Sequence, residues 1–330
     1  MTATHLLAAI GIVLLALLPF AVADYSLHIA IQILIWAFIY TAWSMMGRFG
    51  LTSFGHGAFL GIGAYVPALL WNFYGVTPWL GLPVGMAAAV LMALLFGYPS
   101  FRLRVVGHYF ALVTLALSQV VLLTLTAARE VTGGSLGMTL TTAHSWVALQ
   151  FTDKRTYYWI ALAVWVGGLA VWRWIDRGIG RVALDALSED EDAAASVGIN
   201  VLREKLRVTM VSAALTALGG GLLTQYIQYV NPEVVSGVAV SLQIVFAAIA
   251  GGMHALLGPT VGALFTIVLN EALRILFGTQ FIGAANTIYG ILLILFIIFM
   301  PQGIVGVIEG ISARVVRRAR PPVAAPAARS

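Results

Sequence analysis

A short acidic stretch between two apolar runs contains the residues whose spacing most clearly predicts a specific interaction. Six of the chain's thirteen acidic residues lie between positions 185 and 204. Ser188 and Glu191 fit the S-x-x-E capping box of a helix N-terminus, where the helix dipole also favours acidic side chains. Gly198 can end this helix in the left-handed conformation. The helix would present one small apolar face, formed by Ala193, Ala194 and Val197. It is either a solvated connector or an element that docks against a partner.

Polar side chains inside otherwise apolar runs form a second group of candidates. Thr114 and Ser118 are four residues apart, so in a helix they face the same way. Such residues either line a polar transport pathway or form hydrogen bonds between membrane helices, and their spacing allows both interpretations. The pathway candidates are Ser53, His56, Thr114, Ser118, Gln225 and Gln243.

Two motifs of common enzyme chemistries, the phosphate loop and the H-E-x-x-H zinc site, are missing. A phosphate loop needs the pattern G-x-x-x-x-G-K-[ST], but the only lysines are Lys154 and Lys205, and neither follows a glycine or precedes Ser or Thr. None of the six histidines lies in an H-E-x-x-H pattern. The chain has no cysteine, so it forms no disulfide and no cysteine metal site. We therefore expect no catalytic residues, no metal and no ATP hydrolysis by this chain.

The apolar runs predict the fold class. Of the 330 residues, 61% are hydrophobic and 9% are charged, whereas a soluble domain has about 25% charged residues. Runs of about 20 apolar residues predict helices that cross a membrane, because a helix satisfies its own backbone hydrogen bonds there. We predict an all-α integral membrane protein with about ten crossings. The runs cover roughly residues 6–22, 27–46, 56–71, 79–98, 107–126, 157–174, 208–229, 239–253, 258–277 and 281–300.

The basic residues predict the orientation. If the N-terminus is cytoplasmic, fourteen of the eighteen Lys and Arg residues fall on the cytoplasmic side, as the positive-inside rule expects. Both termini are then cytoplasmic, and so is a loop over residues 175–207 that contains the acidic stretch. Because the basic residues flank the spans, the net charge of +5 reflects orientation in a lipid membrane and does not indicate nucleic-acid binding.

Two glycine-rich segments, 47–65 and 247–265, each lead from a cytoplasmic turn into a span. Glycines permit either close helix crossings or locally unwound helices beside a transport pathway, and both interpretations remain open. The third and eighth runs are short, so they are the ones most expected to be broken or re-entrant. The structural glycines are Gly55, Gly61, Gly63, Gly251, Gly252, Gly258 and Gly262.

The two ends of the chain differ in composition. Residues 1–23 resemble a secretory signal in their apolar core and Ala21-Val22-Ala23 site, but they lack a basic n-region, so we favour a retained first helix. Residues 1–310 then form one transmembrane domain. Residues 311–330 are basic and then rich in Pro and Ala, which predicts a disordered cytoplasmic tail.

Several segments resemble, in order along the chain, the motifs of the LivM-type permeases of bacterial ABC importers for branched-chain amino acids. They are "GLTSFGHGAFLGIGAY" (50–65), "FRLRVVGHYFALVTLALSQ" (101–119), "VTGGSLGM" (131–138) and "NPEVVSGVAVSLQIVFAAIAGGMHALLGPTVGA" (231–263). His108 stands where that family usually has Pro, and His254 follows Met253 where Gly is common. These departures bear on the substrate more than on the fold.

The resemblance implies a type II-like ABC importer permease in the bacterial inner membrane. Glu191, Ala194 and Gly198 match the family's E-x-x-A-x-x-x-G element, which is implied to be a coupling helix that docks on a separate ATPase, with Ser188 and Val197 in the same helix. The implied partners are a homologous permease in a heterodimer, two ABC ATPase subunits and an extracytoplasmic substrate-binding protein. The cofactors, ATP and Mg, would bind the ATPases and not this chain.

Three alternatives remain. An importer of the same family for urea, short amides or aromatic carboxylates would share these motifs. An ion-coupled secondary transporter would need acidic residues deep in the membrane. Glu271, spaced to pair with Arg274 in the same helix, lies near the end of its run instead. A membrane enzyme is disfavoured by the missing motifs.

Overall fold

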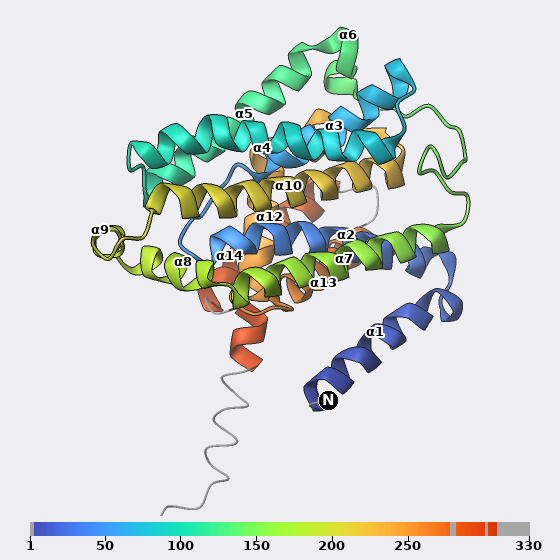
Figure 1. The fold of residues 1–330 in the computed structure, drawn as a ribbon. Coiled ribbons are helices and arrows are strands. Elements are labelled where there is room, and N and C mark those ends of the chain that lie inside the picture. The colour runs from blue at the N-terminus through green and yellow to red at the C-terminus, as the bar shows by residue number, and fades with distance from the viewer. Residues whose placement is uncertain (1–2, 278–281, 301–302, 309–330) are drawn as a thin grey trace, which may run out of the picture.

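A computed structural model describes residues 3–277, 282–300 and 303–308 of the chain (Figure 1). The predicted tail, residues 311–330, lies outside the described residues. Each of the ten predicted apolar runs contains a helix. These helices are α1 (Ala3–Ala21), α2 (Asp24–Gly47), α3 (His56–Tyr74), α4 (Pro78–Arg102), α5 (Gly107–Ala127), α7 (Lys154–Arg177), α10 (Val201–Ile227), α12 (Val238–Gly251), α13 (Gly258–Phe277) and α14 (Ile282–Phe299).

Shorter elements connect these helices at the two ends of the bundle. They are α6 (Arg129–Thr132), η1 (Gly134–Leu136), β1 (Met138–Thr139), α8 (Ile179–Glu189), α9 (Glu191–Ser196), β2 (Tyr229–Val230) and α11 (Pro232–Val235). Strands β1 and β2 pair antiparallel with Met138 opposite Val230, so the long connection after α5 carries only short elements.

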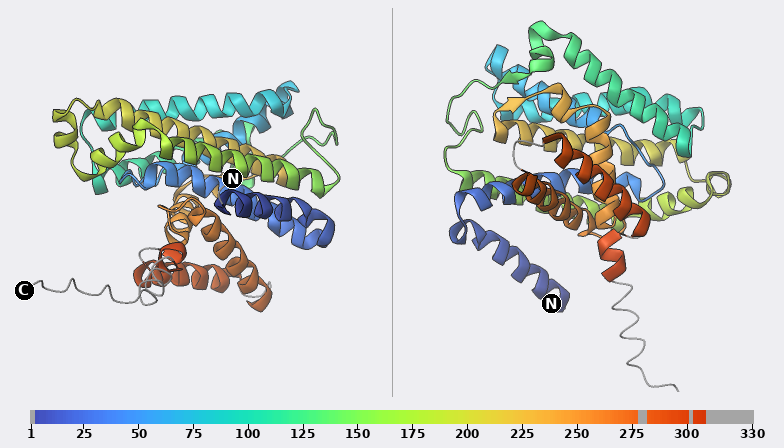
Figure 2. Two further views of the ribbon diagram at one scale, coloured as in Figure 1. Left: turned by 60° about the horizontal axis from the view of Figure 1, so that its bottom comes forward. Right: turned by 180° about the vertical axis from the view of Figure 1, so that it is seen from behind.

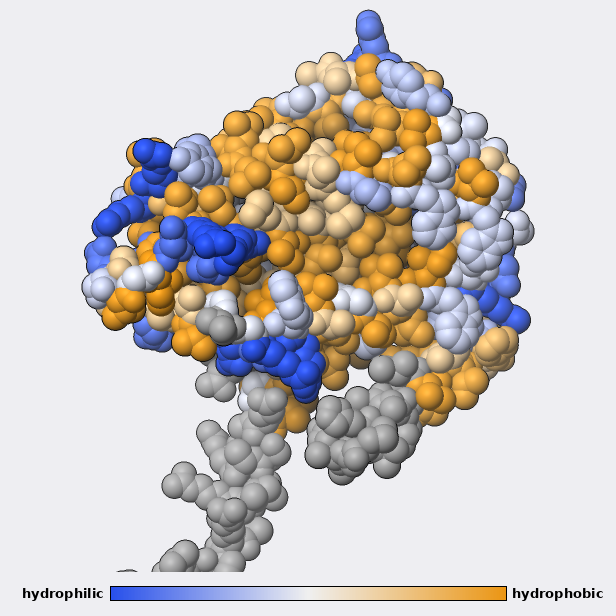
Figure 3. Space-filling model, in the orientation of Figure 1, coloured by the Kyte–Doolittle hydropathy of each residue, from blue (hydrophilic) through white to orange (hydrophobic). Residues whose placement is uncertain are grey.

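Seven segments of the described chain are long and apolar enough to cross a membrane: α2, α4, α5, α7, α10, α13 and Pro232–Gly251, which includes α11 and α12. The face drawn in Figure 3 is hydrophobic over its middle, and hydrophilic residues gather at the end that carries α8 and α9. A helix bundle with such a band is a multi-pass membrane protein, because only the band can face hydrocarbon without exposing charge.

Helix α10 is the central element of the bundle. It packs against α2, α3 and α4, while α2 also packs against α7 and α13. Helices α13 and α14 lie on one side of α2 and α7, and α4 lies on the other (Figure 2). A Cβ atom on Gly63 would lie 2.0 Å from the Ala217 carbonyl oxygen, and one on Gly220 would lie 2.3 Å from that of Leu60. Only glycine at these positions allows α3 and α10 to cross so closely.

The two runs expected to be broken are irregular at one end. Helix α3 begins at the buried His56 after a nonhelical segment, residues 48–55. Helix α12 has 14 residues, which span about 21 Å, less than the roughly 30 Å of a hydrocarbon core. It ends at Gly251, and at the next residue, Gly252 (φ +112°), the backbone turns back so tightly that a Cβ atom on Gly258 would lie 1.7 Å from the Gly252 carbonyl oxygen.

Candidate functional site

The acidic stretch forms two helices rather than one. Helix α8 ends at Glu189, and α9 starts after Asp190, whose carboxylate accepts hydrogen bonds from the backbone N–H groups of Asp192 (2.9 Å) and Ala193 (3.0 Å). Ser188 is therefore not the N-cap that the capping box predicted. Its hydroxyl donates to the Asp185 carbonyl oxygen inside α8. The prediction failed because Asp190 competes for the same role and caps N–H groups two and three residues further along.

The C-terminal end of α9 follows the prediction. Gly198 has a φ of +93°. Its N–H donates to the Ala195 carbonyl oxygen, and the Ile199 N–H donates to that of Ala194. These two bonds form a Schellman motif, which satisfies the last carbonyl groups of the helix.

The predicted apolar face of α9 is not one surface. Ala194 is 3% exposed and packs with Leu184 and Leu187 of α8 and Val208 of α10, whereas Val197 is 76% exposed. The sequence interpretation was wrong here because α9 is only six residues long, and its small Ala194 side chain is buried against other helices of the same chain. Ala193, Val197 and the acidic N-terminus of the helix stay exposed.

Ion pairs hold α9 to the rest of the chain. Lys205 Nζ of α10 donates to Glu191 Oε1, and the Lys205 side chain is 5% exposed. At the surface, Arg104 Nη1 lies 2.9 Å from Asp192 Oδ1. A groove of about 550 Å³ separates the end of α4 from α8 and α9. The groove is lined by arginines on the α4 side and by acids on the other.

Ser53 and Thr114 support the segment that leads into α3. Ser53 Oγ accepts from the Gly55 N–H (3.1 Å), and Thr114 Oγ1 of α5 accepts from the Phe54 N–H (3.0 Å). A Cβ atom on Gly55 would lie 3.0 Å from the Thr114 carbonyl oxygen. The two candidates thus lie close together at the start of α3, where they satisfy backbone groups that a helix would satisfy itself.

His56 and Ser118 lie beside this segment, each bonded to a serine on another helix. His56 Nε2 lies 2.8 Å from Ser212 Oγ of α10. Because the Ser212 hydroxyl donates its one proton to the Ala42 carbonyl oxygen, His56 must be the donor through Nε2. Ser118 Oγ lies 2.9 Å from Ser241 Oγ of α12, which also accepts from the Gly57 N–H. Four helices therefore meet around the first turn of α3.

Gln225 lies away from this meeting point, whereas Gln243 follows Ser241 by two residues on α12. Gln225 lies thirteen residues after Ser212 on α10, a separation of about 20 Å along the helix. It is 0% exposed, and neither atom of its side-chain amide has a hydrogen-bond partner. Gln243 Nε2 donates to Tyr40 Oη at 3.3 Å.

Sequence reasoning missed Lys205, Ser212 and Ser241. Small polar residues in apolar helices commonly bond across helices, so the two serines carried a signal, although one shared by every other Ser and Thr in the spans. Lys205 gave no such signal, because a lysine at the start of a span usually reports orientation.

The described residues contain no group of three or more His, Asp or Glu side chains that could hold a metal ion. What they do contain is a buried polar meeting point of helices inside a membrane bundle, and a separate capped helix at one end. This combination defines a multi-pass helical membrane protein with a polar site inside its bundle.

The chain belongs to the family described as branched-chain amino acid transport system / permease component, which it matches over residues 25–300. It is therefore a transport component and not an enzyme. The high-affinity branched-chain amino acid transport system permease protein LivM of Salmonella typhimurium is 30% identical over 311 residues, covering 87% of this chain and 71% of that protein. LivH of the same organism is 26% identical, covering 79% of this chain and 87% of that protein.

A probable branched-chain amino acid transport permease protein LivH of Methanocaldococcus jannaschii is 25% identical, covering 77% of this chain and 83% of that protein. No solved structure matches the chain. The resemblance to LivM-type permeases stated from the motifs is confirmed, and the chain is a homologue of permeases of the bacterial inner membrane.

Proposed function

We propose that this chain forms the translocation pathway of an ATP-driven importer for branched-chain or related hydrophobic amino acids. The family match over residues 25–300 carries this proposal, together with relatives named as branched-chain amino acid permeases. Since the sequence has no phosphate loop, ATP and Mg would bind two separate ABC ATPase subunits. A homologous permease and an extracytoplasmic substrate-binding protein would complete the complex. That both LivM and LivH resemble this chain supports a heterodimer of related permeases.

In the proposed topology, residues 1–310 form one permease domain with ten crossings, and both termini, including the 311–330 tail, are cytoplasmic. The ion pairs support this arrangement. They gather Arg48, Arg104, Arg181 and Lys205 at the end of the bundle that carries α8 and α9. A concentration of basic residues at one end is typical of the cytoplasmic side.

We infer that α9 is the coupling helix, in a modified form. Val197 and the acids at the N-terminus of α9 would contact the ATPase, the acids opposite basic residues of its groove. Ala194 and Glu191 would anchor the helix to its own chain, Ser188 would support α8, and Gly198 would end α9. ATP-driven movement of the ATPase would then displace α8 and α9 together, since they share one core cluster.

The start of α3 is the proposed moving part of the pathway. Ser53, His56, Thr114 and Ser118 gather there among four helices, and a few exchanged hydrogen bonds would separate them. Gln225 would lie further along the pathway, where its unbonded amide could meet the polar groups of an amino acid. Rocking of the helices about this region gives alternating access.

Uptake by a reconstituted complex tests the proposal. Proteoliposomes would contain this chain, its partner permease, both ATPases and the binding protein, and the uptake of labelled leucine would be measured with and without ATP. Uptake that needs ATP and the ATPases supports the proposal. Uptake that persists without the ATPases would favour an ion-coupled transporter. Uptake of urea, acetamide or benzoate in place of leucine would favour the alternative substrates within the family.

A further inference from the structure

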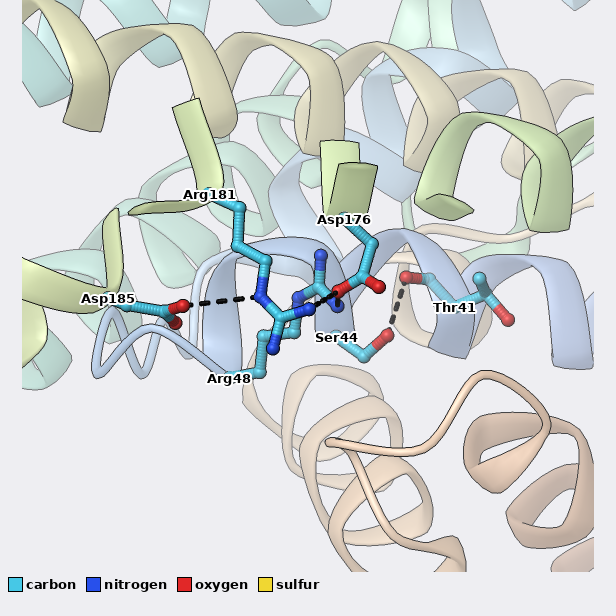
Figure 4. A network of polar contacts seen from close by, with 6 residues as sticks. All are labelled: Thr41, Ser44, Arg48, Asp176, Arg181 and Asp185. Carbon is cyan, nitrogen blue, oxygen red and sulfur yellow. Dashed lines mark hydrogen bonds and ion pairs between the residues drawn. The ribbon is translucent and has the colours of Figure 1, made fainter. Parts of the chain in front are cut away.

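Charged side chains link the end of α2 to the start of α8 (Figure 4). Arg48 Nη1 lies 3.1 Å from Asp176 Oδ1, and the same oxygen lies 3.0 Å from Arg181 Nη1. Arg181 Nε lies 3.2 Å from Asp185 Oδ2. Asp176 belongs to the last turn of α7 and Arg181 to the first turn of α8, with the nonhelical Gly178 between them. The network therefore bridges the joint between α7 and α8.

Arg48 is held firmly in this network. Its side chain is 5% exposed, and its guanidinium carbon lies 3.9 Å from the ring centroid of Trp172 and 4.6 Å from that of Phe49. Burial lowers the pKa of Arg48, while Asp176 opposes that shift, and a guanidinium stays charged at neutral pH. Its Nε and Nη2 are buried without a hydrogen-bond partner. A buried charge held in this way depends strongly on the carboxylate that it contacts.

Arg48 also begins the nonhelical segment 48–55, which leads into α3. Trp43 Nε1 donates to the Ser53 carbonyl oxygen at 2.8 Å, so this segment is bonded back to α2. Its far end is bonded to Thr114 of α5. A shift of Arg48 would therefore pull directly on the backbone that supports His56.

We propose that Arg48 is a positioning residue that transmits movement of α8 to segment 48–55 and the start of α3. The inference rests on the proposed function, in which an ATPase displaces α9 and, with it, α8. Arg181 would then move Asp176, and the buried guanidinium would follow its carboxylate. The Arg207–Glu204 pair lacks this property, because both residues belong to α10 and the Arg207 side chain is 51% exposed, so water can replace it.

A cysteine at Thr52, inside segment 48–55, would report the movement, since the chain has no cysteine of its own. In proteoliposomes of the whole complex, labelling by a maleimide would be timed with and without ATP plus vanadate. We expect ATP and vanadate to change the labelling rate about tenfold with Arg48 present, and to leave it unchanged in Arg48→Lys. Lysine keeps the charge but loses the planar stacking on Trp172. Arg207→Lys is the matched control and should behave like the unsubstituted chain.

The second readout is leucine taken up per ATP hydrolysed, which should fall about tenfold in Arg48→Lys while hydrolysis continues. A nucleotide response that survives in Arg48→Lys would overturn the inference. So would uptake and hydrolysis that fall in equal proportion, which is the mark of a merely structural residue. If Arg48→Lys does not assemble, Arg181→Gln provides the test, because it cuts the link to α8 and spares the Arg48–Asp176 pair. Absence of any ATP-dependent uptake in the unsubstituted complex would instead overturn the proposed function itself.

Discussion

Lys205 of α10 donates to Glu191 at the first position of α9, and the two side chains are unequally buried. Lys205 is 5% exposed and Glu191 is 29% exposed. Helix α9 is therefore joined to the longest helix of the bundle through a charge that cannot easily return to water. Removing Lys205 and removing Glu191 should therefore lower the stability of the protein by different amounts.

Glu191→Gln should destabilise the protein more than Lys205→Met. The first leaves a buried ammonium unpaired, for about 3 kcal/mol, whereas the second leaves a partly exposed carboxylate at a helix N-terminus, for about 1 kcal/mol. The double variant should recover most of the loss of Glu191→Gln. Thermal unfolding in detergent would compare the variants, with the other lysine, in Lys154→Met, as the control. Equal losses for the two single variants would contradict a buried pair.

A cysteine at Val197 should crosslink to co-expressed ATPase subunits, and one at Ala194 should not. The exposed fractions of the two residues, 76% and 3%, differ although they lie three positions apart. Crosslinking in membranes, with and without ATP, would measure the contact. Crosslinks from both positions would show that α9 moves away from α8 and α10 in the complex and exposes Ala194. None from either would count against docking through α9.

Gly63→Ala should destabilise the bundle by about 2 kcal/mol. The new methyl group would lie 2.0 Å from the Ala217 carbonyl oxygen, and this backbone group can move away only if the two helices shift apart. Gly167→Ala in α7 is the matched control. Nothing lies within 4 Å of its Cβ position, so the better helix propensity of Ala should leave stability unchanged or raised by up to about 1 kcal/mol. Thermal unfolding of both variants would decide. If Gly63→Ala leaves the melting temperature unchanged, α3 and α10 must lie further apart than in this structure.

Gln225→Leu should stabilise the protein while it reduces uptake. Both amide atoms of Gln225 are buried without partners, and each such group costs about 1–3 kcal/mol. Gln150 is the matched control, since it is equally buried but bonded to Ala143 and Thr141, so Gln150→Leu should destabilise. Melting temperature and leucine uptake would be measured on both. Unchanged uptake by the Gln225→Leu protein would show that Gln225 does not line the pathway.

The sequence was sufficient to predict the ten long helices and the family. Each of the ten apolar runs contains a helix, because hydrocarbon leaves a backbone no other local way to satisfy its hydrogen bonds. The Glu271–Arg274 pair also formed as predicted, at 2.6 Å, since three residues place two side chains on one helix face. The stop at Gly198 followed from the same kind of local rule.

Only the tertiary structure decided which residues of the acidic stretch face outward and which polar residues meet. Asp190 replaced Ser188 as the cap once α8 and α9 separated, and Ala194 turned inward because Leu184, Leu187 and Val208 offered it a core. The partners of His56, Ser118 and Arg48 lie more than 100 positions away along the chain. Local spacing determines a helix and its faces, but the face that is buried depends on which other helices the fold brings against it.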